Sequence, residues 1–330
     1  MRWVYVRLIL AALTIFTTTN IIFFLIRLMP GNIVDYEINY YVGEMGWTSE
    51  EAYEFLSAAY GLTLDKPFHE QYLSFMANIF TGELGRSLRY GQMPVINIVA
   101  TAIPWTVFTV SISLFASFLL GIVCGIFTAY RHGSKSDKAL TVSSIVVDAI
   151  PNYVIAYFLL ILLASEWDIF PMALAYDVTR VKPGFNLSFV LDVLWHATLP
   201  VISYTVSQFA GWALMMRSTT VSVLGEDYVF AAEARGLKGS KIMWKYVGRN
   251  AMLPMFTLLA IRIGHIFGGS TLIENVFSYP GMGKYIADSI STRDYPIMQG
   301  LFFIIAVSVT LSNLLGDLLY ARLDPRVRLK

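Results

Sequence analysis

Charged residues are scarce in this chain. Asp, Glu, Lys and Arg make up 14% of its 330 residues, whereas soluble globular domains contain roughly 25%. Apolar residues account for 56% of the sequence. This composition excludes an ordinary soluble domain and indicates an integral membrane protein surrounded by the lipid bilayer. The net charge of +1 gives no indication of nucleic acid as a partner.

Cysteine and catalytic motifs are also lacking. The single cysteine, Cys124, lies within an apolar run, which excludes a disulfide framework, a cysteine metal cluster and a redox pair. No Ser/His/Asp arrangement, carboxylate pair or phosphate-binding Gly-Lys-Ser/Thr loop occurs at usable spacing. We therefore expect that the chain alone is not an enzyme and binds no metal, cofactor or ATP.

Long apolar runs dominate instead. A helix needs about 20 apolar residues to cross the hydrocarbon core, and backbone hydrogen bonding in lipid makes each such run a helix. The first run follows a basic start but is too long for a signal peptide. The predicted fold is therefore an all-α polytopic membrane protein with six transmembrane helices. The predicted spans are Leu8–Leu28, Val99–Tyr130, Leu140–Leu163, Leu199–Met216, Met255–Phe277 and Gly300–Tyr320.

Basic residues are unevenly distributed between the two sides of this bundle. Most Lys and Arg residues fall at the two termini and in the connectors on the same side, above all in the loop 217–254. The positive-inside rule places that side in the cytoplasm. The chain then divides into a first span (1–29), an extracytoplasmic loop (30–98) and a five-helix core (99–330) that carries the cytoplasmic loop.

The predicted outer loop is too long for a simple connector and should contain short helices. Thr48–Tyr60 has Ser and Thr before Glu, with apolar residues at helical spacing, and Gly61 ends it. Leu64–Phe80 is a second predicted helix, with Pro67 near its start. These helices either rest on the outer membrane surface or dock an outer partner.

Two short helices are predicted within the cytoplasmic loop 217–254. Asp227 can cap the first, which ends at Gly236, where a left-handed residue is allowed. Ser240 can cap the second, and Pro254 then begins the fifth span. Two such helices, fixed by glycine and exposing alanines, would form a knob that another protein can approach closely. The alternative is an interfacial helix pair with snorkelling lysines.

The cytoplasmic loop resembles the coupling loop, often called the Glu-Ala-Ala loop, of ABC importer permeases. Phe230 stands where the general pattern has glutamate before Ala231-Ala232, and Leu253-Pro254 lies further from Gly236 than usual. Both departures are similar to the dipeptide, oligopeptide and nickel branch. Other segments resemble that branch in the same order along the chain: Arg27–Gly31, Gly82–Leu88, Glu274–Gly283, Arg293–Pro296 and Leu323–Arg326.

The resemblance implies a complex of several subunits in the cytoplasmic (inner) membrane of a prokaryote, with both termini of this chain in the cytoplasm. The implied partners are a second homologous permease, two cytoplasmic ATP-binding subunits that hold ATP and Mg, and an extracytoplasmic solute-binding protein. The residues implied to dock the ATPase are Phe230, Ala231, Ala232, Glu233, Ala234, Arg235, Gly236 and Leu237. Candidates for the outer gate or the binding-protein contact are Glu274, Tyr279, Pro280 and Gly281.

Ionisable residues inside the predicted spans usually face a bundle interior or a cavity. Arg262, His265 and Gly269 share one helix face at positions i, i+3 and i+7. Either Arg262 pairs with Asp148 and both charges are neutralised, or these groups line the pathway and recognise a polar or zwitterionic substrate. The residues predicted to line the translocation path are Asp148, Tyr204, Gln208, Arg262, His265 and Asn313.

The predicted cargo is a di- or oligopeptide. The alternatives within the family are an oligosaccharide importer and a nickel importer. Aromatic residues of the outer loop could stack on sugar rings, but they could equally pack against one another. A rival class is an ion-coupled secondary transporter, for which Asp148 with His265 is the only candidate site. The aromatic residues concerned are Tyr36, Tyr40, Tyr41, Trp47 and Tyr53.

Overall fold

The computed structural model describes residues 2–30, 33–60, 67–87 and 89–323. Within these residues the chain is built of helices and their connectors, with a single isolated bridge between Arg86 and Pro94 and no strand. The predicted all-α polytopic fold is therefore confirmed. Four helices are long and apolar enough to cross a membrane, and two bent helix pairs raise the number to six if each pair is one span. The four are α1 (Arg2–Leu28), α5 (Val95–Tyr130), α8 (Leu187–Leu224) and α14 (Tyr295–Leu323).

The third predicted span, Leu140–Leu163, is bent sharply in the structure. α6 (Lys135–Ala149) ends before Pro151, and α7 (Asn152–Leu159) leaves at 95° and continues as the π-helical segment Leu160–Glu166. Proline disfavours the helical conformation at the residue before it. That residue, Ile150, is accordingly extended, with a ψ of 123°. A single straight helix is thus wrong for this run, although its apolar length is sufficient.

The second short helix of the cytoplasmic loop is not separate from the fifth span. α10 (Gly239–Lys241) continues through the π-helical segment Ile242–Gly248 into α11 (Arg249–Gly264). The prediction that Pro254 begins the span is wrong, because Pro254 lies inside α11. The predicted cap at Ser240 is also wrong, because Lys238 occupies the cap position. One continuous rod therefore connects the cytoplasmic loop to the middle of the bundle.

The outer end of the fifth predicted span is interrupted as well. After α11 comes a 3-10 turn, Ile266–Gly268, and the chain then bends by 41° into α12 (Thr271–Val276). Gly269 at the bend has a φ of 65°, a left-handed conformation that glycine adopts without strain. A turn at Pro280 leads on to α13 (Met282–Thr292), which precedes α14. The run Met255–Phe277 is thus not one continuous helix but a pair of helices joined at a bend.

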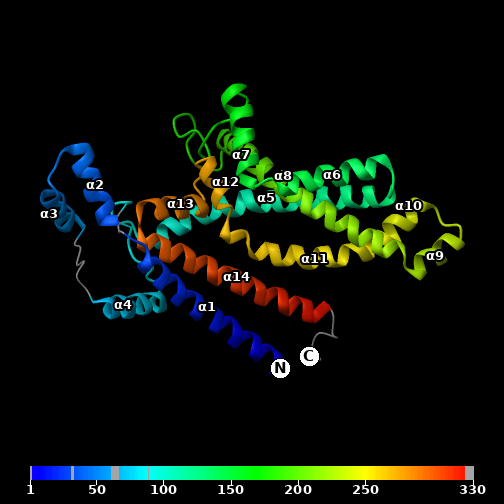
Figure 1. Ribbon diagram of the computed structural model, residues 1–330, viewed down its shortest axis with the longest axis horizontal. Coiled ribbons are helices and arrows are strands. Elements are labelled where there is room, and N and C mark those ends of the chain that lie inside the picture. The colour runs from blue at the N-terminus through cyan, green and yellow to red at the C-terminus, as the bar shows by residue number, and fades with distance from the viewer. Residues whose placement is uncertain (1, 31–32, 61–66, 88, 324–330) are drawn as a thin grey trace.

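α5 and α8 pack against each other at the centre of the bundle (Figure 1). Gly121 and Gly125 lie on the face of α5 that meets α8, and a Cβ at Gly125 would lie 2.5 Å from the Cβ of Met216. On the same face the Ser113 hydroxyl donates to the carbonyl oxygen of Val201 at 3.2 Å. Small residues and interhelical hydrogen bonds are what hold helices together in lipid, so this contact organises the bundle.

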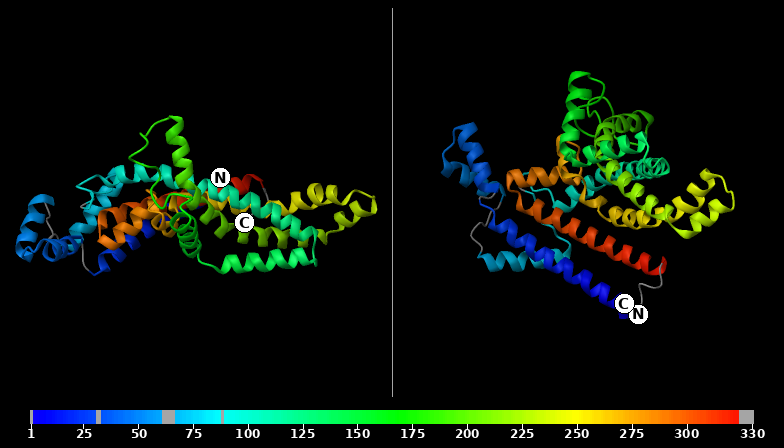
Figure 2. Two further views of the ribbon diagram at one scale, coloured as in Figure 1. Left: turned by 90° about the horizontal axis from the view of Figure 1, so that it is seen from above. Right: turned by 45° about the vertical axis from the view of Figure 1, so that its right-hand side comes forward.

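α1 lies beside α14 at the edge of the bundle (Figure 2). Its apolar side chains are largely uncovered, as the 59% exposure of Leu25 illustrates, which suits contact with lipid. Near the N-terminus of α1 and the C-terminus of α14, Arg7 Nη1 lies 2.8 Å from Asp317 Oδ2. These two helix ends point in the same direction as the tip of the loop 217–254 (Figure 1).

Three short helices lie at the opposite end of the molecule: α2 (Ile33–Met45), α3 (Ser49–Tyr60) and α4 (Phe68–Thr81). α3 follows the expected capping pattern, because the Thr48 N–H donates to Glu51 Oε2 at 2.8 Å and the Glu51 N–H donates to Thr48 Oγ1 at 3.3 Å. The predicted helix Leu64–Phe80 begins only at Phe68 within the described residues, which exclude 61–66. The helix α2 was not foreseen.

Replacing Gly125 by alanine should lower stability, because the new methyl group meets the backbone and side chain of α8, and overpacking typically costs about 1–3 kcal/mol. We expect a lower apparent melting temperature of the detergent-solubilised protein, measured by size-exclusion chromatography after heating. Gly316→Ala in α14 is the matched control: nothing lies within 4 Å of its added Cβ, and alanine is the better helix former. Equal effects of the two variants would contradict the packing role of Gly125.

Candidate functional site

The helix α9 (Asp227–Ala234) lies at the tip of the loop 217–254, which was predicted to be cytoplasmic (Figure 1). Glu226 occupies its N-cap position without a side-chain hydrogen bond, and Asp227 lies in the first turn, so the predicted cap at Asp227 is wrong. The helix terminates at Gly236, whose φ of 69° is the left-handed conformation expected there. The Gly236 N–H donates to the carbonyl oxygen of Glu233 at 2.8 Å, which closes the last turn.

α9 has a buried face and an exposed face. Val229 and Ala232 are 1% and 3% exposed and pack on the π-helical segment Ile242–Gly248. The two predicted alanines are therefore divided: Ala232 belongs to the core, whereas Ala231 is exposed. Phe230 leaves 57% of its side chain exposed beside Ala231. Glu233, Ala234, Arg235 and Gly236 are also exposed, and Leu237 packs partly buried against the same core.

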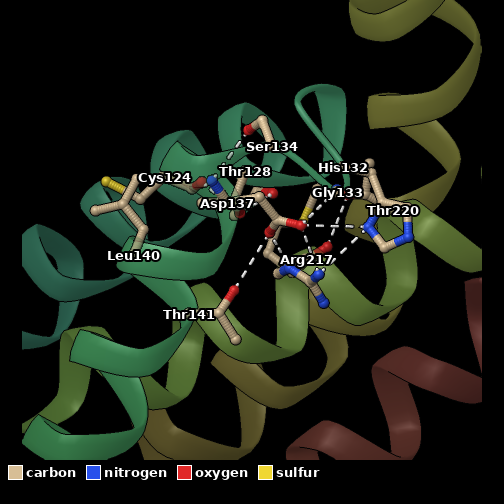
Figure 3. A network of polar contacts seen from close by, with 12 residues as sticks. Cys124, Thr128, His132, Gly133, Ser134, Asp137, Leu140, Thr141, Arg217 and Thr220 are labelled. Carbon is tan, nitrogen blue, oxygen red and sulfur yellow. Dashed lines mark hydrogen bonds and ion pairs between the residues drawn. The ribbon is translucent and has the colours of Figure 1, made fainter.

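An ion pair fixes the inner end of α8, from which α9 follows. Asp137, only 2% exposed, accepts hydrogen bonds from Arg217 Nε at 2.6 Å and Nη2 at 2.9 Å (Figure 3). The same carboxylate accepts the Gly133 N–H at 3.0 Å and the Thr141 hydroxyl at 3.3 Å. His132 Nδ1 lies 3.4 Å from it. A bidentate arginine with further donors satisfies a buried carboxylate, so the α5–α6 turn and α8 are held together.

A cavity of about 330 Å³ lies between α5, α8 and α11. Its wall contains four of the six residues predicted to line the path, namely Tyr204, Gln208, Arg262 and His265. Arg262 Nη1 donates to Gln208 Oε1, and the guanidinium carbon lies 4.9 Å from the centre of the Trp212 ring, within reach of a cation–π interaction. The remaining wall is apolar: Val110, Leu114, Leu258 and Ile261.

The other two predicted path residues lie elsewhere. Asp148 in α6 faces the backbone of α8 near Gly211, where an added Cβ would lie 3.3 Å from Asp148 Oδ1. Asn313 in α14 is not part of the cavity wall. Among the ion pairs of the described residues, none joins Asp148 to Arg262. The partner that Arg262 has in its place is the uncharged Gln208.

Glu274 organises the outer segment that follows α11. Its side chain is buried, Oε1 accepts the Thr106 hydroxyl at 2.9 Å, and Oε2 accepts the Gly283 N–H at 2.7 Å. A Cβ at Gly281 would lie 2.5 Å from the Glu274 carboxyl carbon, so the close approach requires glycine. Tyr279 is also fully buried. Neither Glu274 nor Tyr279 therefore has side-chain surface for direct contact with another protein, and their role at an outer gate stays a prediction.

A third buried carboxylate, that of Asp294, joins two segments that are far apart in the sequence. The Ser87 hydroxyl donates to Asp294 Oδ2 at 2.6 Å, and both side chains are fully buried. Ser87 belongs to the segment Gly82–Leu88 and Asp294 to Arg293–Pro296, two of the segments noted in the sequence. Leu88 and residues 324–326 lie outside the described residues. The spacing of 207 residues explains why sequence patterns alone did not suggest this contact.

Most of the predicted core of the chain matches one protein family. Residues 121–329 match the family described as binding-protein-dependent transport system inner membrane component. The matched region contains the cytoplasmic loop, most of the cavity wall and the segment around Glu274.

Similar curated proteins extend the match to nearly the whole chain. An oligopeptide transport system permease protein of Bacillus subtilis is 33% identical over 80% of this chain and 82% of its own length. A di/tripeptide transport system permease protein of Pseudomonas aeruginosa is 33% identical over 96% of this chain and 95% of its own. A dipeptide transport system permease protein of Escherichia coli is 29% identical over 100% of this chain and 99% of its own.

Removing the carboxylate of Asp137 should destabilise the protein, because Arg217 would keep a partly buried charge without its partner. Breaking a buried pair costs about 3–5 kcal/mol, and we expect Asp137→Ala to fall at the lower end, since the Arg217 side chain is 24% exposed. The measurement is the apparent melting temperature in detergent. The control is Arg180→Ala, which removes an exposed ion pair with Asp177 that is worth at most about 1 kcal/mol. A shift in melting temperature no larger than that of the control would contradict a stabilising role of the Asp137–Arg217 ion pair.

Proposed function

The chain belongs to the family of binding-protein-dependent transport system inner membrane components, and we propose that it is one of two permease subunits of an ATP-driven importer of di- or oligopeptides. It is a multi-pass membrane protein and a transport component that is not catalytic alone. The similar proteins reported above are named for oligopeptide, di/tripeptide and dipeptide transport. Those names, over matches that reach the full chain, are the observation that supports peptide cargo.

The proposed complex contains a second homologous permease, two cytoplasmic ATP-binding subunits and an extracytoplasmic solute-binding protein. ATP and Mg would be held by the ATP-binding subunits. The proposed docking knob is the segment Phe230–Leu237, which comprises the last residues of α9 and the turn that follows it. Its exposed apolar residues Phe230 and Ala231 support this role, because apolar surface at a polar loop is suited to a protein contact. The positive-inside rule supports a cytoplasmic location for α9 and both termini.

Coupling between the knob and the pathway is proposed to be mechanical. The buried face of α9 packs on the π-helical segment Ile242–Gly248, which is continuous with α11. α11 carries Arg262 in the cavity wall and is followed by the bend at Gly269. When the ATPases close, a movement of α9 would therefore shift α11 as a rod and convert an inward-facing pathway to an outward-facing one. Glu274–Gly283 is the proposed outer gate.

Two alternatives have less support. For oligosaccharide cargo, the aromatic residues of the outer loop should be free to stack on sugars. The Tyr41 ring packs instead on Trp47 and Phe55, at 5.0 Å and 5.5 Å, whereas Tyr40 and Tyr53 keep 47% and 41% of their surface exposed. Tyr36 has no described side chain. For an ion-coupled carrier, Asp148 and His265 should share one site, but only His265 lines the cavity. Uptake that persisted without ATP and collapsed with the ion gradient would favour the carrier.

The cargo is tested most directly on the proposed solute-binding partner of this permease. We expect calorimetric titration to detect binding of di- or oligopeptides, because a dedicated binding protein delivers the substrate that its permease carries. Oligosaccharides and Ni²⁺ serve as the comparison ligands. Binding of either of these without binding of peptides would overturn the proposed cargo while leaving the importer class intact.

A bulky substitution on the exposed face of α9 should uncouple transport. We expect Ala231→Trp to abolish ATP-driven uptake in proteoliposomes and to reduce co-purification of the ATP-binding subunits, because the indole would keep the docking surfaces apart. Membrane insertion and melting temperature should remain normal, since Ala231 is exposed. Ala139→Trp on the exposed surface of α6 is the matched control. Normal coupled uptake in the Ala231 variant would show that α9 is not the docking knob.

A further inference from the structure

Arg262 is a cation in a membrane-spanning helix that has no anionic partner within the described residues. No Asp or Glu of that part of the chain lies within 4.0 Å of its guanidinium. The side chain makes one hydrogen bond there, to Gln208, and lies over the Trp212 ring. A guanidinium has five N–H donors, so most of its donor capacity is unused. Arg262 is exposed in this single chain, and a charge on a membrane-spanning helix usually faces a bundle interior or a cavity.

The space beside Arg262 is suited to part of a small ligand. The cavity volume of about 330 Å³ is at the lower end of the range of about 300–1,000 Å³ for small-molecule pockets. Tyr204 and Gln208 project from α8 at i, i+4, Arg262 projects from the last turn of α11, and His265 follows directly after that helix. The polar groups thus converge from two helices, while the facing wall from α5 is apolar. Such a wall favours one charged group joined to an apolar body.

We propose that this cavity is a subsite for a carboxylate of the transported cargo, with Arg262 as the counter-charge. The planar guanidinium matches a carboxylate in a bidentate arrangement. Gln208 orients the guanidinium and leaves its other donors for the ligand. Tyr204 and His265 supply further hydrogen-bonding groups. The inference rests on the proposed function, because every unmodified peptide carries a terminal carboxylate, whereas a neutral sugar or Ni²⁺ carries none.

The fully assembled importer in proteoliposomes, with its binding protein at saturation, provides the test. Uptake of a neutral dipeptide is compared with uptake of its C-terminal amide, and the preference of the binding protein itself is measured separately by titration. We expect Arg262→Gln to reduce the carboxylate preference of transport about tenfold or more, because charge-assisted hydrogen bonds are the stronger class. Arg262→Lys keeps the charge but loses the planar fork, so its preference should be intermediate.

A second variant keeps the test informative if Arg262→Gln does not fold. Gln208→Glu places a carboxylate of the same shape on the guanidinium, so it should occupy Arg262 and lower uptake of the free peptide while the protein stays folded. Lys138→Gln, on an exposed position of α6, removes one positive charge away from the cavity and should leave the preference unchanged. Amidated peptides with an Asp side chain distinguish a side-chain carboxylate from the terminal one as the group that is bound.

The outcomes separate this inference from the proposed function. Reduced preference in Arg262→Gln or Gln208→Glu, with ATP hydrolysis retained, supports the subsite. Wild-type preference in both variants overturns the subsite, although peptide import stands. Absence of peptide uptake by the wild-type importer, together with binding of a cargo without a carboxylate by its binding protein, overturns both.

Discussion

The structure depends on one constraint: a backbone that crosses lipid has to satisfy its own N–H and C=O groups. Long helices meet this requirement, and the departures from helix occur where specific residues permit them. Pro151 ends α6 and allows the bend of 95° into α7. Gly269, at a φ of 65°, ends the fifth span and turns the chain into α12. These breaks decide which parts of the chain are spans and which form the outer segment, where Glu274 can collect backbone donors.

The same constraint makes polar side chains informative, because each one in the bundle must find partners. At the inner end, Asp137 has a bidentate arginine and a backbone N–H. At the outer end, Glu274 accepts the Thr106 hydroxyl and a backbone N–H, so its carboxylate joins α5 to the outer segment. Between them, Arg262 has only Gln208 and an aromatic face. Each end of the bundle therefore holds a buried carboxylate with several hydrogen-bond donors, whereas Arg262 in the cavity wall has unused donors.

The lengths of the apolar runs and the positions of helix-terminating glycines were enough to predict much of the fold. Six apolar runs correspond to the four long helices and two bent pairs, and Gly236 ends α9 because a left-handed residue is needed there. Contacts between distant residues were not accessible in this way. Asp137 and Arg217 are 80 positions apart, and each alone looks like an ordinary charged residue beside a membrane. Likewise, Ala231 and Ala232 are identical in type, and only the packing of α9 decides which is buried.

Helical periodicity predicted the positions of the path residues better than their charges predicted their partners. Arg262 and His265 were placed on one face by spacing, as were Tyr204 and Gln208, and these two faces meet in the cavity. Opposite charge suggested Asp148 as the partner of Arg262, but α6 presents Asp148 to α8 near Gly211. A helix face is a local property that the sequence determines, whereas pairing depends on which helices become neighbours. In α11 the predicted helix face and the observed packing coincide. One continuous helical rod leads from the segment on which α9 packs to Arg262 in the cavity wall.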